Sequence, residues 1–175
     1  YKATAAVLAN RGIKSPKEAQ KFLNSGLESE YDSRLFKDAE KAVKMLFKTI
    51  KEKKKITVLG DYDVDGVMST VILYKTLKAF DADVDFYVPH RQKEGYGMNI
   101  EAVDELKKRG TDLIFTCDNG IAAHEEIRLA KELGMDVVVI DHHEPAFEAD
   151  EEGNKKDILP LADAVIDSKR KDCQY

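Results

Sequence analysis

Short apolar runs alternate with amphipathic helical patterns between residues 56 and 142, and this alternation constrains the fold more than any other feature. The runs are rich in branched and aromatic residues and lie at 56–59, 84–88, 113–117 and 137–140. Helical patterns separate them at 66–80, 99–109 and 122–133. A strand–helix–strand repeat requires right-handed crossovers and a parallel sheet that helices cover on both faces. With a further run at 164–166, the sequence predicts an α/β fold with a three-layer parallel β-sheet of about five strands flanked by helices.

The segment before the first apolar run is helical. Residues 1–55 show helical patterns at 4–11, after Ser15-Pro16, and at 38–53, with no strand pattern. Serine followed by proline is typical of a helix N-cap and first helical position. We therefore expect a helical leader over 1–55 and a sheet domain over 56–175. The acidic and polar stretch 144–162 is long for a connection and is expected to be either a mobile loop or a functional one.

Composition excludes several classes of protein. The net charge is −5, from 28 basic and 33 acidic residues, which disfavours a domain that binds duplex nucleic acid unaided. No apolar run approaches the ~20 residues of a membrane span, so no membrane partner is expected. Cys117 and Cys173 are too few for a disulfide framework, and the absence of a signal-peptide pattern favours a cytoplasmic location.

Polar side chains follow each of the first four predicted strands, at the point where the strand ends. Ligands of open parallel sheets bind at the carboxyl ends of the strands, so these side chains are expected to form one site. In chain order, they are Asp61, Asp63 and Asp65, then Arg91, then Asp118, then Asp141, His142 and His143.

The three aspartates after the first strand favour a metal ion. An EF-hand loop needs an acidic twelfth residue, and Ile72 stands there instead, after a strand and not a helix. A solvated turn with a helix N-cap would explain one aspartate but not three. Alternate residues of an extended segment face the same side, so the three carboxylates are expected to converge and to need a divalent cation.

The paired histidines indicate which metal. A single histidine is more often a packing residue than a ligand, but His142 and His143 are adjacent and follow an aspartate at a strand end. Histidine with carboxylates suits Mn²⁺ better than Ca²⁺, and Mg²⁺ stays open. We expect Asp141 to orient one imidazole from behind the ligands. Arg91, next to a glycine-containing loop, offers a bidentate phosphate contact, although an exposed arginine alone is a weak signal.

Three motifs resemble those of a known family. Asp-Tyr-Asp-Val-Asp-Gly at 61–66, Cys-Asp-Asn-Gly-Ile at 117–121 and Asp-His-His at 141–143 look like the first three motifs of the DHH phosphoesterase superfamily. Glu-Gly-Tyr-Gly at 94–97 and Asp-His-His-Glu-Pro at 141–145 narrow the resemblance to its single-strand-specific 5′→3′ DNA exonucleases. The helical leader is also similar to the segment that precedes the catalytic core of those enzymes.

This resemblance implies a two-metal phosphodiesterase that degrades single-stranded DNA in recombination and repair. Its cofactors would be two divalent ions, Mn²⁺ in preference or Mg²⁺. Arg91 matches a position near the substrate phosphate, and Asp65 and Asp118 are expected to bridge the ions, because a carboxylate can span two cations. The implied partners are single-stranded DNA, a single-stranded-DNA-binding protein and a helicase. The matching metal-site positions are Asp61, Asp63, Asp65, Asp118, His142 and His143.

The resemblance also implies parts that this sequence does not contain. The chain ends at Tyr175, before the fourth motif and the second, DNA-clamping domain of the family, so weak or no activity is expected of this piece alone. Two alternatives remain: a DHH-family phosphoesterase for short oligonucleotides or cyclic dinucleotides, and a non-catalytic DHH-like scaffold. A receiver-type phosphoacceptor domain would leave the paired histidines without a role.

Overall fold

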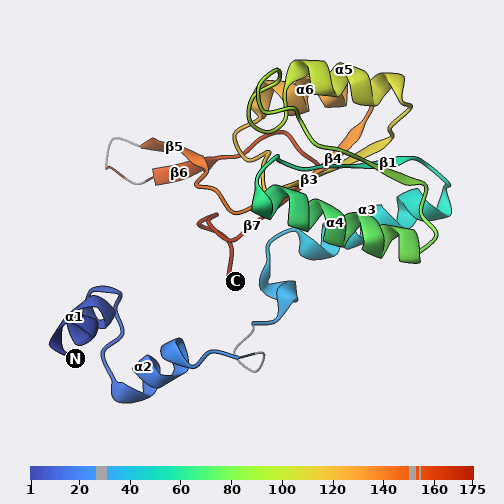
Figure 1. Cartoon of the computed structure of the whole chain (residues 1–175). Coiled ribbons are helices and arrows are strands. Elements are labelled where there is room, and N and C mark those ends of the chain that lie inside the picture. Colours follow the sequence, from blue (N-terminus) through green and yellow to red (C-terminus); the bar gives the residue numbers. More distant parts are fainter. Residues whose placement is uncertain (27–30, 150–152, 154) are drawn as a thin grey trace. The chain divides into compact units, whose positions relative to one another are not determined.

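The computed structural model describes residues 1–26, 31–149, 153 and 155–175. The chain divides into two compact units, Tyr1–Asp32 and Ser33–Tyr175, and each is described by itself (Figure 1). Within the described residues, no helix is both long and apolar enough to cross a membrane.

The first unit contains two helices, α1 (Lys2–Asn10) and α2 (Pro16–Leu23). As predicted, Ser15 caps α2: its hydroxyl accepts a hydrogen bond from the backbone N–H of Glu18 at 3.2 Å. The Glu18 carboxylate in turn accepts one from the N–H of Ser15 at 3.1 Å. This reciprocal capping satisfies N–H groups that the first turn of a helix leaves without partners.

The second unit is built on a five-stranded sheet, which confirms the predicted fold class. Its strand order is β2-β1-β3-β4-β7, and every neighbouring pair is parallel. Every residue of β1 and β3 is buried, as expected of central strands covered on both faces. The strands are β1 (Ile56–Leu59), β2 (Val84–Tyr87), β3 (Leu113–Cys117), β4 (Asp136–Asp141) and β7 (Ala164–Asp167).

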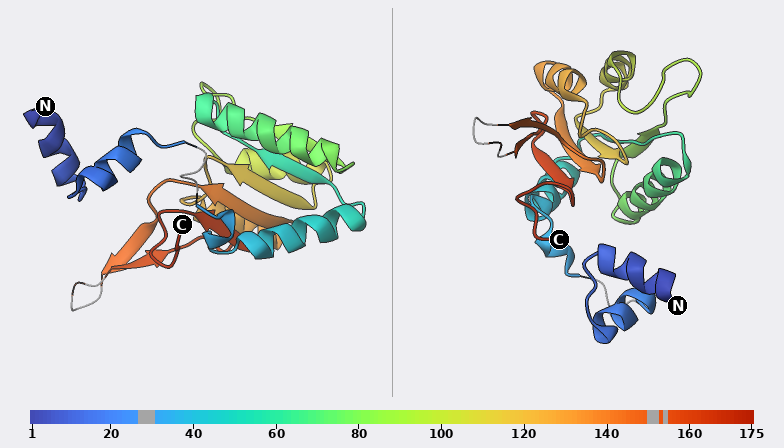
Figure 2. Two further views of the ribbon diagram at one scale, coloured as in Figure 1. Left: turned by 90° about the horizontal axis from the view of Figure 1, so that it is seen from below. Right: turned by 90° about the vertical axis from the view of Figure 1, so that its left-hand side faces the viewer.

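Helices cover both faces of this sheet (Figure 2). On one face lie α3 (Ala39–Lys51) and α4 (Val64–Ala79), and on the other α5 (Ile100–Lys108) and α6 (His124–Glu132). Alternate residues of each strand feed two separate cores, because successive side chains point to opposite faces. Val58 and Phe115 pack with the first pair of helices, whereas Leu59 and Ile114 pack with the second.

Helix α3 belongs with the sheet, although the sequence groups it with the leader. The Asp38 carboxylate accepts hydrogen bonds from the N–H of Val165 in β7 at 3.2 Å and from the Arg170 guanidinium at 2.9 Å. Ala42 and Thr49, on the inner side of α3, are buried. The second compact unit therefore starts at Ser33, with the short 3₁₀ helix η2 (Ser33–Leu35), and not at the expected boundary after residue 55.

The expected loop at 144–162 contains a small hairpin, so that prediction is wrong for its described residues. Strand β5 (Ala146–Ala149) pairs antiparallel with β6 (Lys155–Ile158) in a separate two-stranded sheet. Every residue of β5 is exposed, so neither strand shows the apolar alternation that reveals a half-buried strand in a sequence. Residues 150–152 and 154 lie outside the described residues.

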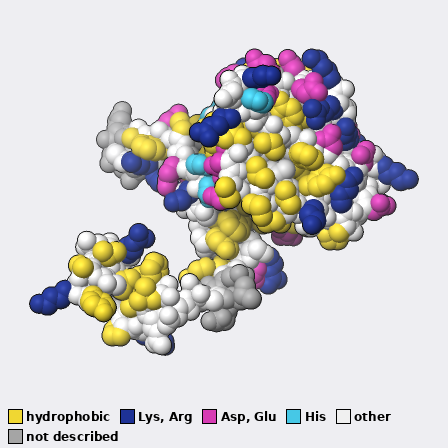
Figure 3. Space-filling model, viewed as in Figure 1, with side chains coloured by type: hydrophobic (Ala, Val, Ile, Leu, Met, Phe, Trp, Pro, Cys, Tyr) yellow, Lys and Arg dark blue, Asp and Glu magenta, His cyan; other side chains and the backbone are white. Residues whose placement is uncertain are grey.

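The outer face of α4 is apolar as well as the inner one. Hydrophobic side chains gather over this helix in the space-filling view (Figure 3). The exposed ones are Val64, Val67, Met68, Val71 and Ile72. A helix that is apolar all round is typical of a buried position, so this face is unusual for a helix at the surface.

Candidate metal centre

Acidic and histidine side chains meet at the carboxyl-terminal edge of the sheet. They follow β1, β3 and β4, which are neighbours in the strand order. Figure 3 shows histidine and acidic side chains next to one another along one edge of the second unit. The fold therefore brings together five of the predicted strand-end residues: Asp61, Asp63, Asp118, His142 and His143.

Two overlapping groups of potential ligands lie at this edge. One consists of Asp61, Asp63 and Asp118, and the other of Asp118, His142 and His143. Within each group the ligand atoms lie within 4.8 Å of one another. Asp118 is common to both, and its Oδ1 is 3.0 Å from Nε2 of His142. A carboxylate shared between two ligand groups fits the expectation that Asp118 bridges two ions.

Asp61 carries a buried oxygen that calls for a cation. The residue is fully buried, and its Oδ1 accepts only a long hydrogen bond, 3.3 Å, from the N–H of Gly97. Its Oδ2 is buried with no hydrogen-bond partner among the residues that the structure describes. Buried polar atoms are normally paired, and a divalent ion would supply the missing partner. The donor set of this site therefore fits a divalent metal.

The three aspartates of 61–65 do not all converge, because the segment is not extended throughout. Asp63 is the N-cap of α4, and its Oδ1 accepts a hydrogen bond from the N–H of Gly66 at 3.0 Å. That bond holds the pKa of Asp63 below its usual value. The helix begins at Val64, so Asp65 lies in its first turn, exposed and outside both ligand groups. Asp65 instead lines a hollow beside Asp118 and His142.

Asp118 is held tightly after β3. Its backbone adopts the left-handed conformation, with φ of 63°, and its side chain is only 7% exposed. Burial raises the pKa of Asp118, and the neighbouring carboxylate of Asp63 raises it further. A cation placed between the two carboxylates would reverse both effects, because it favours the charged form of each.

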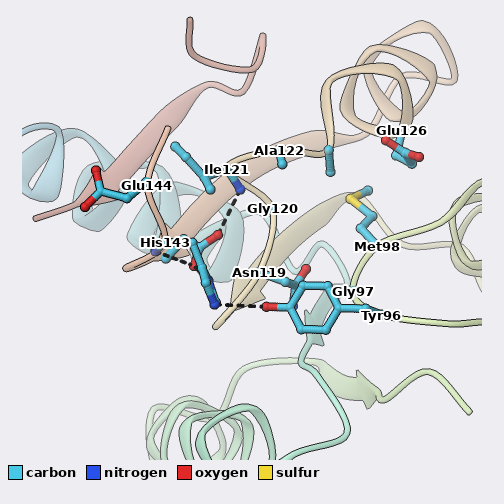
Figure 4. Close-up of a pocket in the computed structure, with 12 residues that line it drawn as sticks. Tyr96, Gly97, Met98, Asn119, Gly120, Ile121, Ala122, Glu126, His143 and Glu144 are labelled. Atoms are coloured by element: carbon cyan, nitrogen blue, oxygen red, sulfur yellow. Dashed lines mark hydrogen bonds and ion pairs between the residues drawn. The ribbon is translucent and has the colours of Figure 1, made fainter. Parts of the chain in front are cut away.

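Asp141 contacts His143, and the contact is of the kind expected of a carboxylate that orients an imidazole. Its Oδ1 lies 2.7 Å from Nδ1 of His143 and 2.7 Å from the backbone N of His142. Its Oδ2 accepts a hydrogen bond from the N–H of Ile121 at 2.9 Å (Figure 4). The contact between the Asp141 carboxylate and the His143 ring raises the pKa of His143. It also fixes the ring so that Nε2 faces the site, which is the arrangement of an imidazole ligand with a carboxylate behind it.

Tyr96, the tyrosine of the Glu-Gly-Tyr-Gly segment at 94–97, closes one side of the site. Its hydroxyl donates a hydrogen bond to the carbonyl of Asp118 at 2.9 Å. The same hydroxyl lies 3.3 Å from Nε2 of His143 (Figure 4). Its ring makes an edge contact with Tyr62, at 6.2 Å between centroids. The Arg91 guanidinium lies 5.2 Å from the centroid of Tyr62, so the predicted phosphate-binding arginine is next to the acidic segment.

Two further residues of the site were missed as functional residues in the sequence. Asp167 ends β7 opposite Asp141, and burial raises its pKa to about 6. Its Oδ2 has no hydrogen-bond partner in the described part of the chain. Gly66 permits close packing, because a Cβ atom there would be 2.6 Å from the backbone N and O of Asp61. The available signal for Asp167 was its position at a strand end, as for Asp141.

Other candidate residues lie apart from the ligand groups. His124 is the first residue of α6, is half-buried and belongs to neither group. Cys117 is buried at the end of β3, and burial raises its pKa to about 12, as expected of a core thiol. The N–H of His90 donates a hydrogen bond to Glu94 at 2.6 Å.

Comparisons with known proteins agree with this geometry. Residues 55–174 match the sequence profile of the DHH family, N-terminal domain. The chain is 41% identical over 171 residues to the single-stranded-DNA-specific exonuclease RecJ of Bacillus subtilis, covering 98% of this chain and 20% of that protein. It is 35% identical over 168 residues to the RecJ of Escherichia coli, covering 95% of this chain and 27% of that protein.

Solved structures are similar as well. A crystal structure of exonuclease RecJ bound to manganese matches with a TM-score of 0.67 and 36% identity, over 79% of this chain and 33% of that one. RecJ from Thermus thermophilus in complex with Mn²⁺ matches with a TM-score of 0.67 and 28% identity, over 96% of this chain and 22% of that one. The chain thus spans only 20% and 27% of the length of the two curated relatives above.

Proposed function

The chain belongs to the DHH family, and from that premise we propose that it forms the metal-binding part of an exonuclease that hydrolyses single-stranded DNA with two divalent ions. The observation that carries the proposal is the position of Asp118, which is shared by two ligand groups at the end of a parallel sheet. One carboxylate serving two neighbouring groups is the arrangement that a two-metal phosphodiesterase needs.

The described residues supply two sets of ligands for such a site. Asp61 and Asp63 would hold one ion together with Asp118, and His142 and His143 would hold the other with the same carboxylate. Asp65 stays a predicted ligand. When bound, two such ions supply an activated water and stabilise the charge of the leaving oxygen. The mixture of imidazoles and carboxylates favours Mn²⁺, with Mg²⁺ as the second choice.

The remaining residues of the site position these ligands and the substrate. Asp141 keeps the His143 ring in one orientation through its 2.7 Å contact with Nδ1. Arg91 is exposed beside Tyr62, where its guanidinium is free to turn toward a phosphate and bind it bidentately. The tyrosine ring supports the guanidinium and leaves its N–H groups available to a ligand.

The finer points of the proposal rest on the family resemblance. They are digestion from the 5′ end, a role in recombination and repair, and a cytoplasmic location. A single-stranded-DNA-binding protein and a helicase are the proposed protein partners. The residues after 55 are proposed to be the catalytic domain, which the profile match over 55–174 supports.

Metal binding tests the site directly. Calorimetric titration of the 175-residue chain with Mn²⁺ is expected to show tight binding that Asp118→Ala abolishes, because both ligand groups lose a member. His124→Ala is the matched control and is expected to bind Mn²⁺ as the unchanged chain does, since His124 lies outside both groups. Equal titration curves for the chain and Asp118→Ala would refute the assignment.

The substrate is tested on the complete gene product, because the family resemblance implies a further motif. With Mn²⁺ it is expected to shorten a 5′-phosphorylated single strand from the 5′ end and to leave a duplex of the same sequence intact. Hydrolysis of a dinucleotide with no action on the long strand would instead identify a short-oligonucleotide phosphoesterase. Tight Mn²⁺ binding without hydrolysis of either substrate would contradict the proposed activity.

A further inference from the structure

The outer side of α3 carries a row of lysines away from the metal centre. Four lysines recur at intervals of three or four residues along the helix, so at ~100° per residue they fall within an arc of about 80°. The row is about 15 Å long, at ~1.5 Å per residue. All of its members are exposed: Lys41, Lys44, Lys48 and Lys51. We call these residues the α3 lysine row.

The positive charge of this region is only partly neutralised. Residues 37–55 contain eight lysines and three acidic residues, whereas the whole chain has a net charge of −5. Lys44 pairs with Glu40 at 2.7 Å and Lys48 with Glu52 at 4.0 Å. Both pairs are exposed to solvent, where an ion pair contributes little free energy and is easily exchanged for another partner. No ion pair of Lys41 or Lys51 occurs among the described residues.

A hollow continues the row beyond the start of the helix. It has a volume of about 500 Å³ and lies where η2 leads into α3. Lys41 and Lys44 of the row line it together with Arg34 and Lys37. Three acidic residues line it as well, and each is paired with a basic side chain: Asp38, Glu40 and Asp172. Among the described residues, Lys37 has one ion pair, a long one with Asp172 at 3.9 Å, so its charge is only weakly neutralised.

The α3 lysine row begins near the edge of the sheet that carries the metal centre. Asp38, the N-cap of α3, is bonded to Val165 in β7, and β7 is the neighbour of β4, whose end carries the histidines. Helix α3 ends shortly before Ile56, the first residue of β1, so the helix runs along the sheet from the site edge toward the opposite edge (Figure 2). Neighbouring strands are ~4.8 Å apart, so β7, which contacts the start of α3, is about 10 Å from β3, the strand that Asp118 follows.

An aromatic side chain borders the row. Phe47 is 52% exposed and lies on α3 between Lys44 and Lys48 in sequence. Its ring makes a T-shaped contact with the ring of Phe80, at 6.0 Å between centroids, and about half of the residue stays exposed. Evenly spaced cations beside an exposed aromatic ring are the combination that binds single strands, because phosphates pair with the cations and bases stack on the ring.

We infer that the α3 lysine row, together with Lys37 at the hollow where it begins, binds the phosphate backbone of single-stranded DNA outside the metal centre. The inference rests on the proposed function for the identity of the strand, but the binding itself needs no metal ion. An acidic protein segment would satisfy the charges of the row but would make no use of Phe47. The sugar–phosphate backbone, which repeats one charge per nucleotide, fits the row better.

Fluorescence anisotropy of a labelled oligothymidylate, measured with EDTA and the 175-residue chain at several salt concentrations, tests this surface. The variant Lys41→Glu/Lys44→Glu/Lys48→Glu is expected to bind at least ~10-fold more weakly, with a salt slope smaller by about 2, since each lost phosphate contact contributes ~0.7. The control Lys75→Glu/Lys107→Glu/Lys108→Glu changes the net charge equally at exposed lysines of α4 and α5 and is expected to bind normally. Circular dichroism checks that α3 remains helical in the variant.

Four results would overturn the inference: no binding by the unchanged chain at low salt, no loss in the row variant, an equal loss in the control, or displacement of the oligonucleotide by polyglutamate at equal charge. Hydrolysis of a dinucleotide by the complete gene product is measured in parallel and is expected to be the same in the row variant. Normal hydrolysis with unchanged strand binding in the row variant would reject the surface alone. Weaker strand binding in the row variant, with hydrolysis of neither the dinucleotide nor a 5′-phosphorylated single strand by any of the proteins, would reject the proposed function alone.

Discussion

Replacement of Asp141 by asparagine distinguishes two roles of this residue, which lies behind the metal ligands. One role is to tune His143 as a ligand, and the other is to stabilise the fold. The Asp141 side chain is 1% exposed and accepts hydrogen bonds at both oxygens. Oδ1 serves the backbone N of His142 and Nδ1 of His143, each at 2.7 Å, and Oδ2 serves the N of Ile121 at 2.9 Å. Asparagine retains one oxygen, so one of the two sets of donors must face an N–H₂ group.

The expected size of the effect follows from these contacts. With the amide oxygen in the place of Oδ1, only the N–H of Ile121 is left unpaired, which costs about 1–3 kcal/mol of folding free energy for a buried group. The bond to His143 then loses the charge of the carboxylate. Loss of such a partner behind a ligand typically lowers metal affinity 10–100-fold, or about 1.4–2.7 kcal/mol.

Two measurements on Asp141→Asn check this reasoning: urea denaturation without metal and calorimetric titration with Mn²⁺. Asp163→Asn is the matched control, because the Asp163 carboxylate also accepts a backbone hydrogen bond, from Val137 at 2.8 Å, but at the amino-terminal end of β4. The control is expected to lose folding free energy and to keep its Mn²⁺ affinity. If Asp141→Asn behaves in the same way, Asp141 is a structural residue and does not tune the histidine.

Three other predictions concern the surroundings of the site. Arg91→Ala in the complete gene product is expected to weaken binding of a 5′-phosphorylated single strand by about 1.5–3 kcal/mol, the range for a charged hydrogen bond; an unchanged KM would remove Arg91 from the site, and the Mn²⁺ titration serves as the control. Gly66→Ala places a Cβ atom 2.6 Å from the backbone of Asp61, so it is expected to lower the free energy of unfolding by about 1–3 kcal/mol and to weaken Mn²⁺ binding. Full stability in urea denaturation would show that the backbone adjusts at no cost. The hydroxyl of Tyr87 and the N–H of His90 hold the pKa of Glu94 below its ordinary 4.5, so the stability these contacts contribute is present above pH 4.5 and is lost as the pH falls through the lowered pKa. An NMR titration of Glu94 with a midpoint above 4.5 would contradict this.

The architecture and the location of the site could be predicted from the sequence. Four apolar runs separated by helical patterns define a parallel sheet, because parallel strands need a crossover and a helix is the usual one. Parallel strands also end at one edge, so residues such as Asp61, Asp118 and His142, far apart in the chain, must meet there. The first turn of α2 was equally predictable, since Ser15 and Glu18 cap it through contacts only three residues apart.

Predictions that depended on the exact start of an element were less successful. The spacing of Asp61, Asp63 and Asp65 is that of an extended strand, yet Asp63 caps α4 and Asp65 already belongs to the helix. Alternation and helical periodicity cannot be distinguished over three residues at the junction of the two. The hairpin of β5 and β6 escaped detection for a related reason, because its strands bury too little surface to produce an alternating pattern.

Local patterns thus specify which elements form and which ends of them meet, because those relations depend on periodicity and on chain direction. The distances across the sheet depend on the strand order and on how each helix packs against it. That packing buries Asp61 with one oxygen that has no partner among the described residues, makes Asp118 common to two ligand groups and brings Asp167 opposite Asp141. It also joins α3 to the sheet through Asp38, which the helical pattern of residues 38–53 could not show. Contacts between residues more than a hundred positions apart leave no trace in the local sequence, so only the folded chain shows them.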